Sequence, residues 1–436
     1  MPEFEATPFM GIRGSQSFIQ DARPKSWRQM LLRLDPSGSA ALTALTSMMP
    51  NEPKDDYDFN WFTKILPLQG GDITDIFTDA ALSTSYAGTT PAVSGDTLYI
   101  QAPQETVEHF TNNYDIRIAK KQDIRVQVNA EVKEITKAGA DSSIKIELLT
   151  DDVSGNSIAN ADFTFVIGNA NEEHATMPEA IMYDEKKFYN LAQTFRTPLK
   201  MSRRAIKTRY RTGDKKQEAK FDTLRIHGKQ MEFAYLLGQK SNETGPNGLP
   251  KTRTQGLFWF LKENLPSHIE QYNLSADFTG QTWLEGGYDF LDKITELLSR
   301  YMSGGEIMCL IGSKGFQAVT QIAREHGDIS IEPTSTSFGL NIKTWIGNNM
   351  IVHFFTHPLF SQNPVLRRTG VFLNPSHVRN AVFTDTFYKK DSSDTQNTNN
   401  SRDGQEEEFL SDMGPEFWHP NTFYWASGFG LDNQLA

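Results

Sequence analysis

The chain has 436 residues, with 43 Lys and Arg against 54 Asp and Glu, which gives a formal net charge of -11. Hydrophobic residues make up 38% and charged residues 22%, a composition typical of a folded chain and too apolar for a disordered one. Cys309 is the only cysteine, which excludes a disulfide framework within one chain and any zinc or iron–sulfur site with several cysteine ligands.

Residues 1–62 form a polar leader that we expect to be an N-terminal arm. No apolar stretch follows its acidic start, so we expect no secretory signal. Trp27–Leu34 is a short amphipathic stretch that stops at Asp35-Pro36, and Ser39–Met49 is a second short helix candidate. The leader has too little apolar periodicity to fold alone, so we expect it to lie on another part of an assembly.

The apolar periodicity changes to two after the arm, and we expect residues 63–168 to form an inserted β-rich domain. Turns of Gly, Asn, Asp and Ser separate the alternating runs, which predict strands at Thr97–Ile100, Ile124–Val128, Ile144–Leu148 and Phe163–Ile167.

Residues 169–200 are first polar and acidic and then alternate, and residues 201–285 contain the clearest helix in the chain. We expect this helix over residues 216–237, with Gly238 as its C-terminal stop. Its predicted buried face carries residues at steps of three and four, namely Phe221, Leu224, Gly228, Met231 and Tyr235.

Residues 286–385 have the pattern of an α/β unit. Helices are expected over residues 290–301 and 313–326, and strands over 307–311, 342–346 and 350–355. The apolar runs here are strand-sized and too short to cross a bilayer, so we expect no membrane partner. Residues 386–436 begin with an acidic stretch and end in short aromatic strands.

Familiar catalytic devices are missing from the sequence. It has no phosphate-binding loop, no G-x-G-x-x-G after a strand, no H-E-x-x-H and no G-x-S-x-G. His353 and His357 are four residues apart on a strand, which does not bring them together as metal ligands, and Cys309 lies in an apolar strand as an inert thiol. Glu406-Glu407-Glu408 could supply paired carboxylates, but a solvated acidic segment is the favoured interpretation. We therefore expect no enzyme, no metal and no cofactor.

Charge is distributed unevenly along the chain. Residues 196–220 carry ten Lys and Arg against two acids, a net charge of +8, and residues 391–436 carry one Arg against nine acids, a net charge of -8. These two segments can pair with each other or with copies of the chain, and the alternative is two unrelated solvated faces. A sequence-specific nucleic-acid reader is disfavoured, because such proteins are normally basic overall.

The order of these features resembles the major capsid proteins of tailed bacteriophages, with the Hong-Kong-ninety-seven-like capsid fold. A polar arm and a β-prone segment precede Phe195-Arg196-Thr197-Pro198-Leu199-Lys200-Met201-Ser202, which leads into a long amphipathic helix. The helix end Met231–Gly238, the following loop to Arg253-Thr254-Gln255-Gly256-Leu257 and the returning segment Glu408–Glu416 are also similar, as is the leader segment Arg28–Ser47.

The resemblance implies an α+β fold with an N-terminal arm, an extended loop, a long spine helix, and peripheral and axial domains. Residues 201–285 would be the peripheral domain with the spine helix, 286–385 the axial domain and 386–436 the C-terminal peripheral strands. The inserted β-rich domain is an addition of roughly a hundred residues to the minimal family. Residues 169–200 are the first choice for the extended loop and strands, and the insertion itself is the second.

The function implied by the resemblance is structural. Copies would assemble in the host cytoplasm as hexamers and pentamers of an icosahedral shell around double-stranded DNA, with arm and extended loop lying across neighbours. DNA would be held non-specifically, and a portal and scaffolding or decoration proteins would be further partners. The expected inter-subunit contacts are Arg196, Lys200, Arg203, Arg204, Lys207, Arg209, Arg211, Glu406, Glu407 and Glu408, and the expected arm contacts are Trp27, Leu31 and Leu34.

Two alternatives stay open at this point. One is the shell protein of an encapsulin-like bacterial nanocompartment with the same fold. The other is a non-viral carbohydrate-binding or carbohydrate-active β protein, which rests on the β-rich stretch and the C-terminal aromatic residues.

Overall fold

The computed structural model describes residues 45, 49–174, 177, 179–210, 213–302, 305–326, 333–337, 340–346, 350–390 and 404–435. The predicted arm contacts Trp27, Leu31 and Leu34 and the predicted basic contact Arg211 lie outside these residues. The chain divides into two compact units: Met1–Trp61 with Lys187–Ala436 form unit 1, and Phe62–Lys186 form unit 2.

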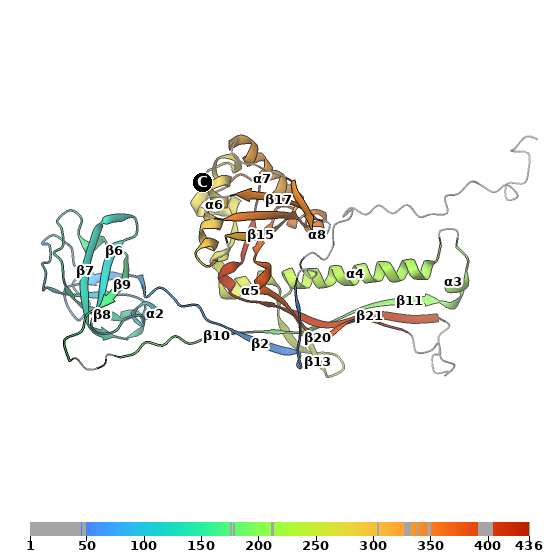
Figure 1. Cartoon of the computed structure of the whole chain (residues 1–436), viewed down its shortest axis with the longest axis horizontal. Coiled ribbons are helices and arrows are strands. Elements are labelled where there is room, and N and C mark those ends of the chain that lie inside the picture. Colours follow the sequence, from blue (N-terminus) through green and yellow to red (C-terminus); the bar gives the residue numbers. More distant parts are fainter. Residues whose placement is uncertain are drawn as a thin grey trace, which may run out of the picture. The chain divides into compact units, whose positions relative to one another are not determined.

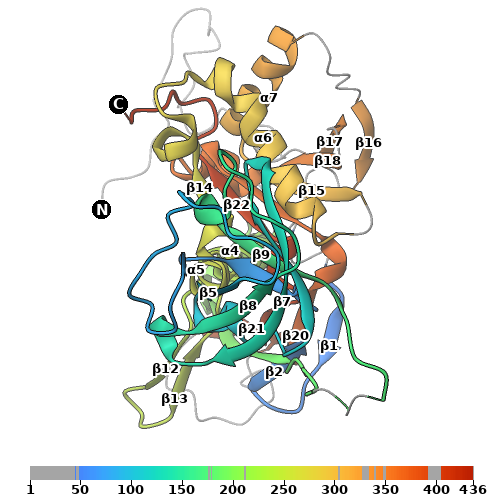
Figure 2. The ribbon, with the colours of Figure 1, turned by 90° about the vertical axis from the view of Figure 1, so that its left-hand side faces the viewer.

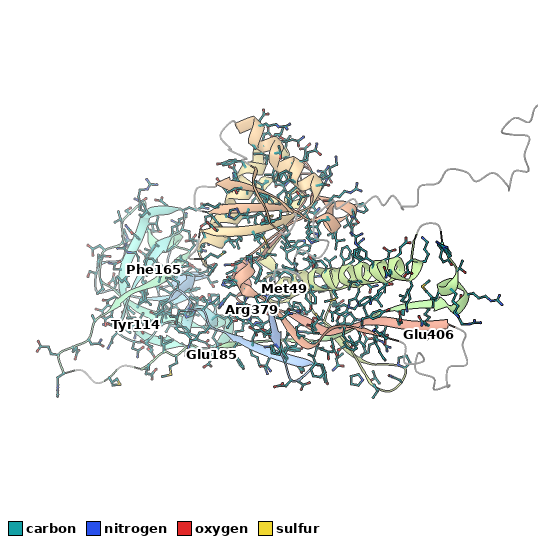
Figure 3. All side chains as sticks on the ribbon, turned by 45° about the vertical axis from the view of Figure 1, so that its right-hand side comes forward. Met49, Tyr114, Phe165, Glu185, Arg379 and Glu406 are labelled. Atoms are coloured by element: carbon teal, nitrogen blue, oxygen red, sulfur yellow. The ribbon has the colours of Figure 1, made fainter. Side chains whose placement is uncertain are left out.

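Unit 2 is a closed β structure built around its own core. Its elements are β3 Gly70–Asp72, β4 Asp75–Phe77, β5 Thr97–Gln101, the short helix α2 Gln104–Val107, β6 Tyr114–Lys120, β7 Asp123–Thr136, β8 Ser143–Leu148 and β9 Phe163–Asn169. Figure 3 labels Tyr114 and Phe165 on two of these strands, which pair in an antiparallel register. The four strands predicted from the alternating runs are confirmed.

The strand order of unit 2, β3-β9-β6-β7-β8-β5-β4, places two sequence neighbours at opposite edges. Only Ile73 and Thr74 separate β3 from β4. The Ile73 amide donates to the carbonyl of Asp162 (3.0 Å) and the Thr74 amide donates to the carbonyl of Gln101 (2.8 Å). One short segment therefore joins both edges and closes the sheet, which leaves no long unpaired edge for aggregation.

The first layer of unit 1 is a four-stranded sheet in the order β1-β20-β21-β11. Its strands are β1 Asn51–Pro53, β11 Gln193–Ser202, β20 Val378–Lys389 and β21 Gly404–Phe417. The short helix α3 (Arg203–Lys207) follows β11, and the long helix α4 (Lys215–Leu237) then runs back along β11 and β21 (Figure 1). Smaller pairs join β2 Asp58–Thr63 to β10 Lys186–Leu191, and β12 Ser241–Thr244 to β13 Pro250–Arg253.

The second layer of unit 1 is a seven-stranded mixed sheet in the order β14-β22-β19-β15-β18-β17-β16. Its strands are β14 Ile269–Gln271, β15 Glu306–Ile311, β16 Pro333–Ser337, β17 Leu340–Ile346, β18 Ile351–Thr356, β19 Gly370–Leu373 and β22 Tyr424–Ser427. Its helices are α5 Leu257–Asn264, α6 Trp283–Ser299, α7 Ser313–His326 and α8 Pro358–Gln362. Helices α6 and α7 pack together and share one core with the central strands (Figure 2).

A fully buried polar cluster joins three distant segments of unit 1. Oε1 of Glu232 on α4 accepts a hydrogen bond from the backbone amide of Leu45 (2.7 Å) and lies 2.9 Å from Nε2 of His357, which precedes α8. The side chains of Glu232 and His357 are both 0% exposed. The cluster ties the end of the N-terminal arm and the α/β layer to one turn of the long helix.

Helix α4 has the predicted bounds to within one residue, and it ends before Gly238 as expected. A Cβ at Gly238 would lie 2.4 Å from the carbonyl oxygen of Ala234, so close approach requires glycine there. The predicted buried face of this helix is correct for its second half and wrong for its first half. Met231 and Tyr235 are buried, but Phe221 and Leu224 are 54% and 42% exposed.

The physical reason is that different neighbours cover the two halves of the helix. The first half rests on the sheet through Thr223 and His227, which the apolar pattern did not single out. The second half packs in the main core of unit 1, where Met231, Tyr235 and Leu236 contact residues from both layers.

We expect residues 62–186 to fold alone, because the core of unit 2 is formed entirely by its own residues. In this fragment, Ile146→Ala is expected to lower the free energy of unfolding by about 2–5 kcal/mol, since Ile146 is 0% exposed and lies between Leu98 and Val132. Urea unfolding followed by circular dichroism measures the change. The control Ile124→Ala, at an 80% exposed position, should shift it by no more than about 0.5 kcal/mol. Equal effects of the two substitutions would contradict the assigned core.

Glu232→Ala is expected to destabilise unit 1 by about 3–5 kcal/mol, because it leaves the Leu45 amide and His357 without their buried acceptor. Glu232→Gln retains an acceptor oxygen and should cost clearly less. Calorimetry of the unit 1 transition in the full chain measures both variants. A loss below about 1 kcal/mol for Glu232→Ala would refute the anchoring role.

Candidate inter-subunit surface

The candidate contact residues gather at one end of the four-stranded sheet of unit 1. Strand β11 ends there at Ser202, and β21 begins there at Gly404, with which Ser202 pairs. Helix α3 and the start of α4 follow. We call the segment from Arg203 to Lys216 the basic tip.

Two side-chain caps shape the basic tip. Oγ of Ser202 accepts a hydrogen bond from the amide of Ala205 (3.3 Å) and caps the start of α3. The Asp214 carboxylate accepts from the amides of Lys216 (2.8 Å) and Gln217 (3.4 Å) and starts α4. Between the two helices the chain turns through Gly213, whose φ of 102° favours glycine.

A hollow of about 460 Å³ lies between α3 and the start of α4. Four of the residues that line it are cationic: Lys207, Arg209, Lys215 and Lys216. Asp214 also lines it, but this carboxylate is occupied in capping α4. Lys215 forms an ion pair with Glu218 (2.6 Å) and Lys216 with Glu407 (3.1 Å), so the surplus positive charge of the hollow comes from Lys207 and Arg209.

The edge strand β11 pairs with the acidic strand β21 over ten residues, from Gln193 with Met413 to Ser202 with Gly404. Arg196 binds Glu408 through two hydrogen bonds, from Nε (2.9 Å) and from one terminal nitrogen (2.8 Å). Lys200 forms an ion pair with Glu406 at 3.3 Å. Arg196, Lys200, Glu406 and Glu408 therefore form a cross-strand ladder of charges on one face of the sheet.

Glu407 points to the opposite face, toward helix α4. Its carboxylate lies 3.1 Å from Nζ of Lys216 and accepts a short hydrogen bond from the hydroxyl of Tyr388. Burial and this carboxylate together raise the pKa of Tyr388 far above its ordinary value. Lys220 lies over the Tyr388 ring, 3.6 Å from its centroid. Glu407 is 8% exposed, so the interpretation of this acidic triplet as solvated is wrong for its central member.

His227 fastens α4 to both strands beneath it. Its Nδ1 lies 2.9 Å from Oγ1 of Thr197 on β11, and its Nε2 lies 2.6 Å from Oγ of Ser411 on β21. Burial lowers the pKa of His227, which keeps the ring neutral near pH 7. The charged rows of β11 and β21 are held in register by this neutral, hydrogen-bonded ring.

The structure brings together several predicted contacts within one chain: Arg196 with Glu408, and Lys200 with Glu406. Figure 3 labels Glu406 near the start of β21. Arg204, Lys207 and Arg209 are exposed and form no ion pair with any carboxylate in the described residues. Their role between subunits, like that of Arg203, stays a prediction.

Sequence reasoning missed the partners that β20 and α4 supply to the acidic triplet. Lys389 lies 3.4 Å from Glu408, and Tyr388 and Lys216 hold Glu407. The alternation of Glu406, Glu407 and Glu408 on a strand predicted two faces, but no signal in the sequence identified the strand or helix on each face.

Two other classes of site find no support in the described residues. No group of three or more His, Cys, Asp or Glu side chains among them could hold a metal ion. Within the same ranges, no helix is both long enough and apolar enough to span a membrane.

The pair of Arg196 with Glu408 is expected to stabilise the chain in a pH-dependent way. Burial alone would raise the pKa of Glu408, but the hydrogen bonds and charges of Arg196 and Lys389 outweigh it and hold the pKa below 4.5. A carboxyl group whose pKa is lower in the folded than in the unfolded chain stabilises the fold at pH values above its unfolded-state pKa. This stabilisation is lost as the pH falls through its folded-state pKa.

Arg196→Gln is therefore expected to cost at most about 1 kcal/mol at pH 7, because the pair is partly exposed and screened. The difference from the unsubstituted chain should close as the pH is lowered below 4.5. Urea unfolding at a series of pH values measures it. Lys137→Gln, at an exposed lysine without an ion pair among the described residues, is the control. A difference that widens at acid pH would contradict the assignment.

Comparisons with known proteins agree with one family. The family model of the SU10 major capsid protein matches residues 12–418. The chain is 21% identical over 359 residues to the major capsid protein of Pseudomonas phage PaMx41, which covers 81% of this chain and 77% of the relative.

The solved structures that match the chain include chains of several phages. A chain of Mycobacterium phage Bobi has a TM-score of 0.44 at 8% identity and covers 95% of this chain and 98% of its own. A chain of Mycobacterium phage Cain has a TM-score of 0.43 at 11% identity, and the match covers 97% of this chain and 96% of the phage chain. The SrpI encapsulin of Synechococcus elongatus PCC 7942 has a TM-score of 0.38 at 11% identity, and the match covers 58% of this chain and 79% of the encapsulin chain.

The family match includes most of the arm, the four-stranded sheet of unit 1, the second layer of unit 1 apart from β22, and all of unit 2. The resemblance to tailed-bacteriophage major capsid proteins, and the α+β fold class that it implied, are confirmed. The chain belongs to the SU10 major capsid protein family and is a structural subunit that assembles with copies of itself in a phage capsid.

Proposed function

We propose that copies of this chain assemble as hexamers and pentamers of a closed icosahedral shell that encloses double-stranded DNA, and that the basic tip contacts carboxylates of a neighbouring copy. The observation that carries this proposal is the surplus of positive charge at the tip. The acidic triplet beside the tip already has partners in its own chain, namely Arg196, Lys200, Lys216 and Lys389. Arg204, Lys207 and Arg209 have none among the described carboxylates.

A second copy of the chain is a suitable source of the missing carboxylates. The chain carries 54 Asp and Glu against 43 Lys and Arg, so its remaining surface has an excess of acid. Within a closed ring of identical subunits each copy meets the next one in the same way, so one tip contact is repeated around the ring. Charge pairs of this kind fix register and partner choice more than they add affinity.

The net charge of -11 also supports a DNA container. Each phosphate contact would add salt-dependent affinity, and many strong contacts on the inner wall would oppose packaging. We propose that DNA is enclosed without sequence-specific contacts, that assembly takes place in the host cytoplasm, and that a portal and scaffolding or decoration proteins are further partners.

We propose that unit 2 and its flanking segments, rather than residues 169–200 alone, take the position of the extended loop. Residues 62–186 leave unit 1 directly after β2 and return at β10, and these two strands pair with each other. The flanking segments carry exposed apolar side chains, which are typical of surfaces that another chain covers: Leu66, Leu68, Met177 and Met182 are 67–94% exposed.

Lys207→Glu with Arg209→Glu is expected to reduce the fraction of protein that forms shells, because reversed charges at the tip would repel the neighbour's carboxylates. Electron microscopy and sedimentation of the expressed protein measure this fraction, and the unsubstituted chain should give uniform closed shells. Lys137→Glu with Lys251→Glu reverses two exposed charges elsewhere and is the control. Normal shells from the tip variant would refute the contact, and a monomeric unsubstituted chain under all assembly conditions would refute the shell.

A further inference from the structure

The first half of helix α4 presents an apolar strip that unit 1 leaves uncovered. Phe221 is 54% exposed and Leu224 is 42% exposed, and the two lie one turn apart on the helix. Gly228 continues the strip by a further turn and adds no side chain to cover it. The guanidinium of Arg225 lies 5.4 Å from the centroid of the Phe221 ring and shields part of one side only. Large apolar side chains on a continuous stripe of this kind are typical of a helix face that packs against another element.

The same face is covered where the arm enters the structure. Beyond Gly228 the stripe continues through Met231 and Tyr235, which are 8% and 0% exposed. At this point the arm reaches α4: the Leu45 amide donates to Glu232, and the Leu45 side chain is 1% exposed within the main core. The boundary between the covered and the uncovered half of the face thus lies close to Glu232, where Leu45, the first described residue of the arm, contacts α4.

The distance from this anchor to the strip is short. At about 1.5 Å per helical residue, Leu224 lies about 12 Å and Phe221 about 17 Å along α4 from Glu232. Residues 35–44, which precede the anchor, span about 33 Å when extended.

The arm contains one segment whose pattern fits such a strip. Residues 27–34 carry apolar side chains at positions 0, 3, 4 and 7 counted from Trp27, the spacing of one helical face. These residues are Trp27, Met30, Leu31 and Leu34. Pro36 lies two residues beyond Leu34 and ends this segment before the anchor. The rest of the leader offers no second apolar stripe of comparable length before Ser39.

We propose that residues 27–34 of the arm form a helix that packs, within the same chain, on the strip formed by Phe221, Leu224 and Gly228. The occupant is the chain's own arm, because Leu45 holds the arm on the helix that carries the strip. Packing in this way would complete the apolar face of α4 in a single subunit. The inference concerns the subunit before assembly, so its failure and the failure of the proposed shell contacts can be told apart.

Disulfide trapping in the full chain tests the proposal. Leu31→Cys is combined with Leu224→Cys in one variant and with Ile226→Cys in the control. Ile226 is similarly exposed, at 49%, but lies on a different side of α4, and the native Cys309 is buried and does not compete. After mild oxidation of the unassembled protein, the Leu224→Cys variant should form at least roughly tenfold more intrachain disulfide than the control, because packing raises the effective concentration of the two thiols.

Non-reducing electrophoresis and mass spectrometry of the linked peptides separate the outcomes. An intrachain bond at position 224 in clear excess over position 226 supports the proposal. Disulfide-linked dimers at position 224 would overturn it in favour of an arm supplied by a second copy. Equal linkage at positions 224 and 226, or none at either, would also overturn it.

A second readout does not depend on introduced thiols. Trypsin cleavage at Arg28 and Arg33 of the unassembled chain should rise roughly fivefold in Leu224→Asp, because a buried charge would release the arm. Ile226→Asp should leave the cleavage rate unchanged, and calorimetry of the unit 1 transition verifies that both variants are folded. Equal cleavage of the two folded variants would contradict the docking.

Discussion

The architecture of unit 1 depends on one buried carboxylate, that of Glu232. A carboxylate without solvent is costly unless hydrogen bonds compensate for the lost water. Here the compensation comes from two segments far away in the sequence, the Leu45 amide and the His357 ring. The long helix, the arm and the α/β layer therefore meet at one point, and each segment satisfies a polar group of another.

A second constraint is the alternation of charges along β21. Because successive strand residues point to opposite faces, Glu406 and Glu408 meet the cations of β11 while Glu407 meets Lys216 and Tyr388 beneath α4. The acidic strand is thus neutralised from both sides within one chain. The positive charge of the basic tip is what remains, and the proposed contact between copies uses that remainder.

Several features of the fold were predictable because they depend on local patterns. The bounds of α4, its end before Gly238 and four strands of unit 2 follow from periodicity and turn residues. The buried face of α4 was not predictable in the same way, because burial of Phe221 and Leu224 depends on which element lies over the helix. The closure of unit 2 by β3 and β4 could not be predicted from the sequence either, because each strand has only three residues and both pair with segments outside their own neighbourhood.

The candidate surface was predictable in composition but not in geometry. Counting charges found both the basic and the acidic segment, whereas their pairing joins residues more than two hundred positions apart, such as Arg196 and Glu408. No local pattern encodes such a register, and the contributions of Tyr388 and Lys389 arise only when β20 is placed beside β21. The apolar pattern of α4 did not predict that His227 would contact the sheet through hydrogen bonds to β11 and β21.

The most direct test of the central claim is an electron-microscopic reconstruction of the assembled shell at side-chain resolution. The account predicts that Arg204, Lys207 and Arg209 of each basic tip lie within about 4 Å of carboxylates from a neighbouring copy. Tips that face solvent, or that contact only carboxylates of their own chain, would contradict it.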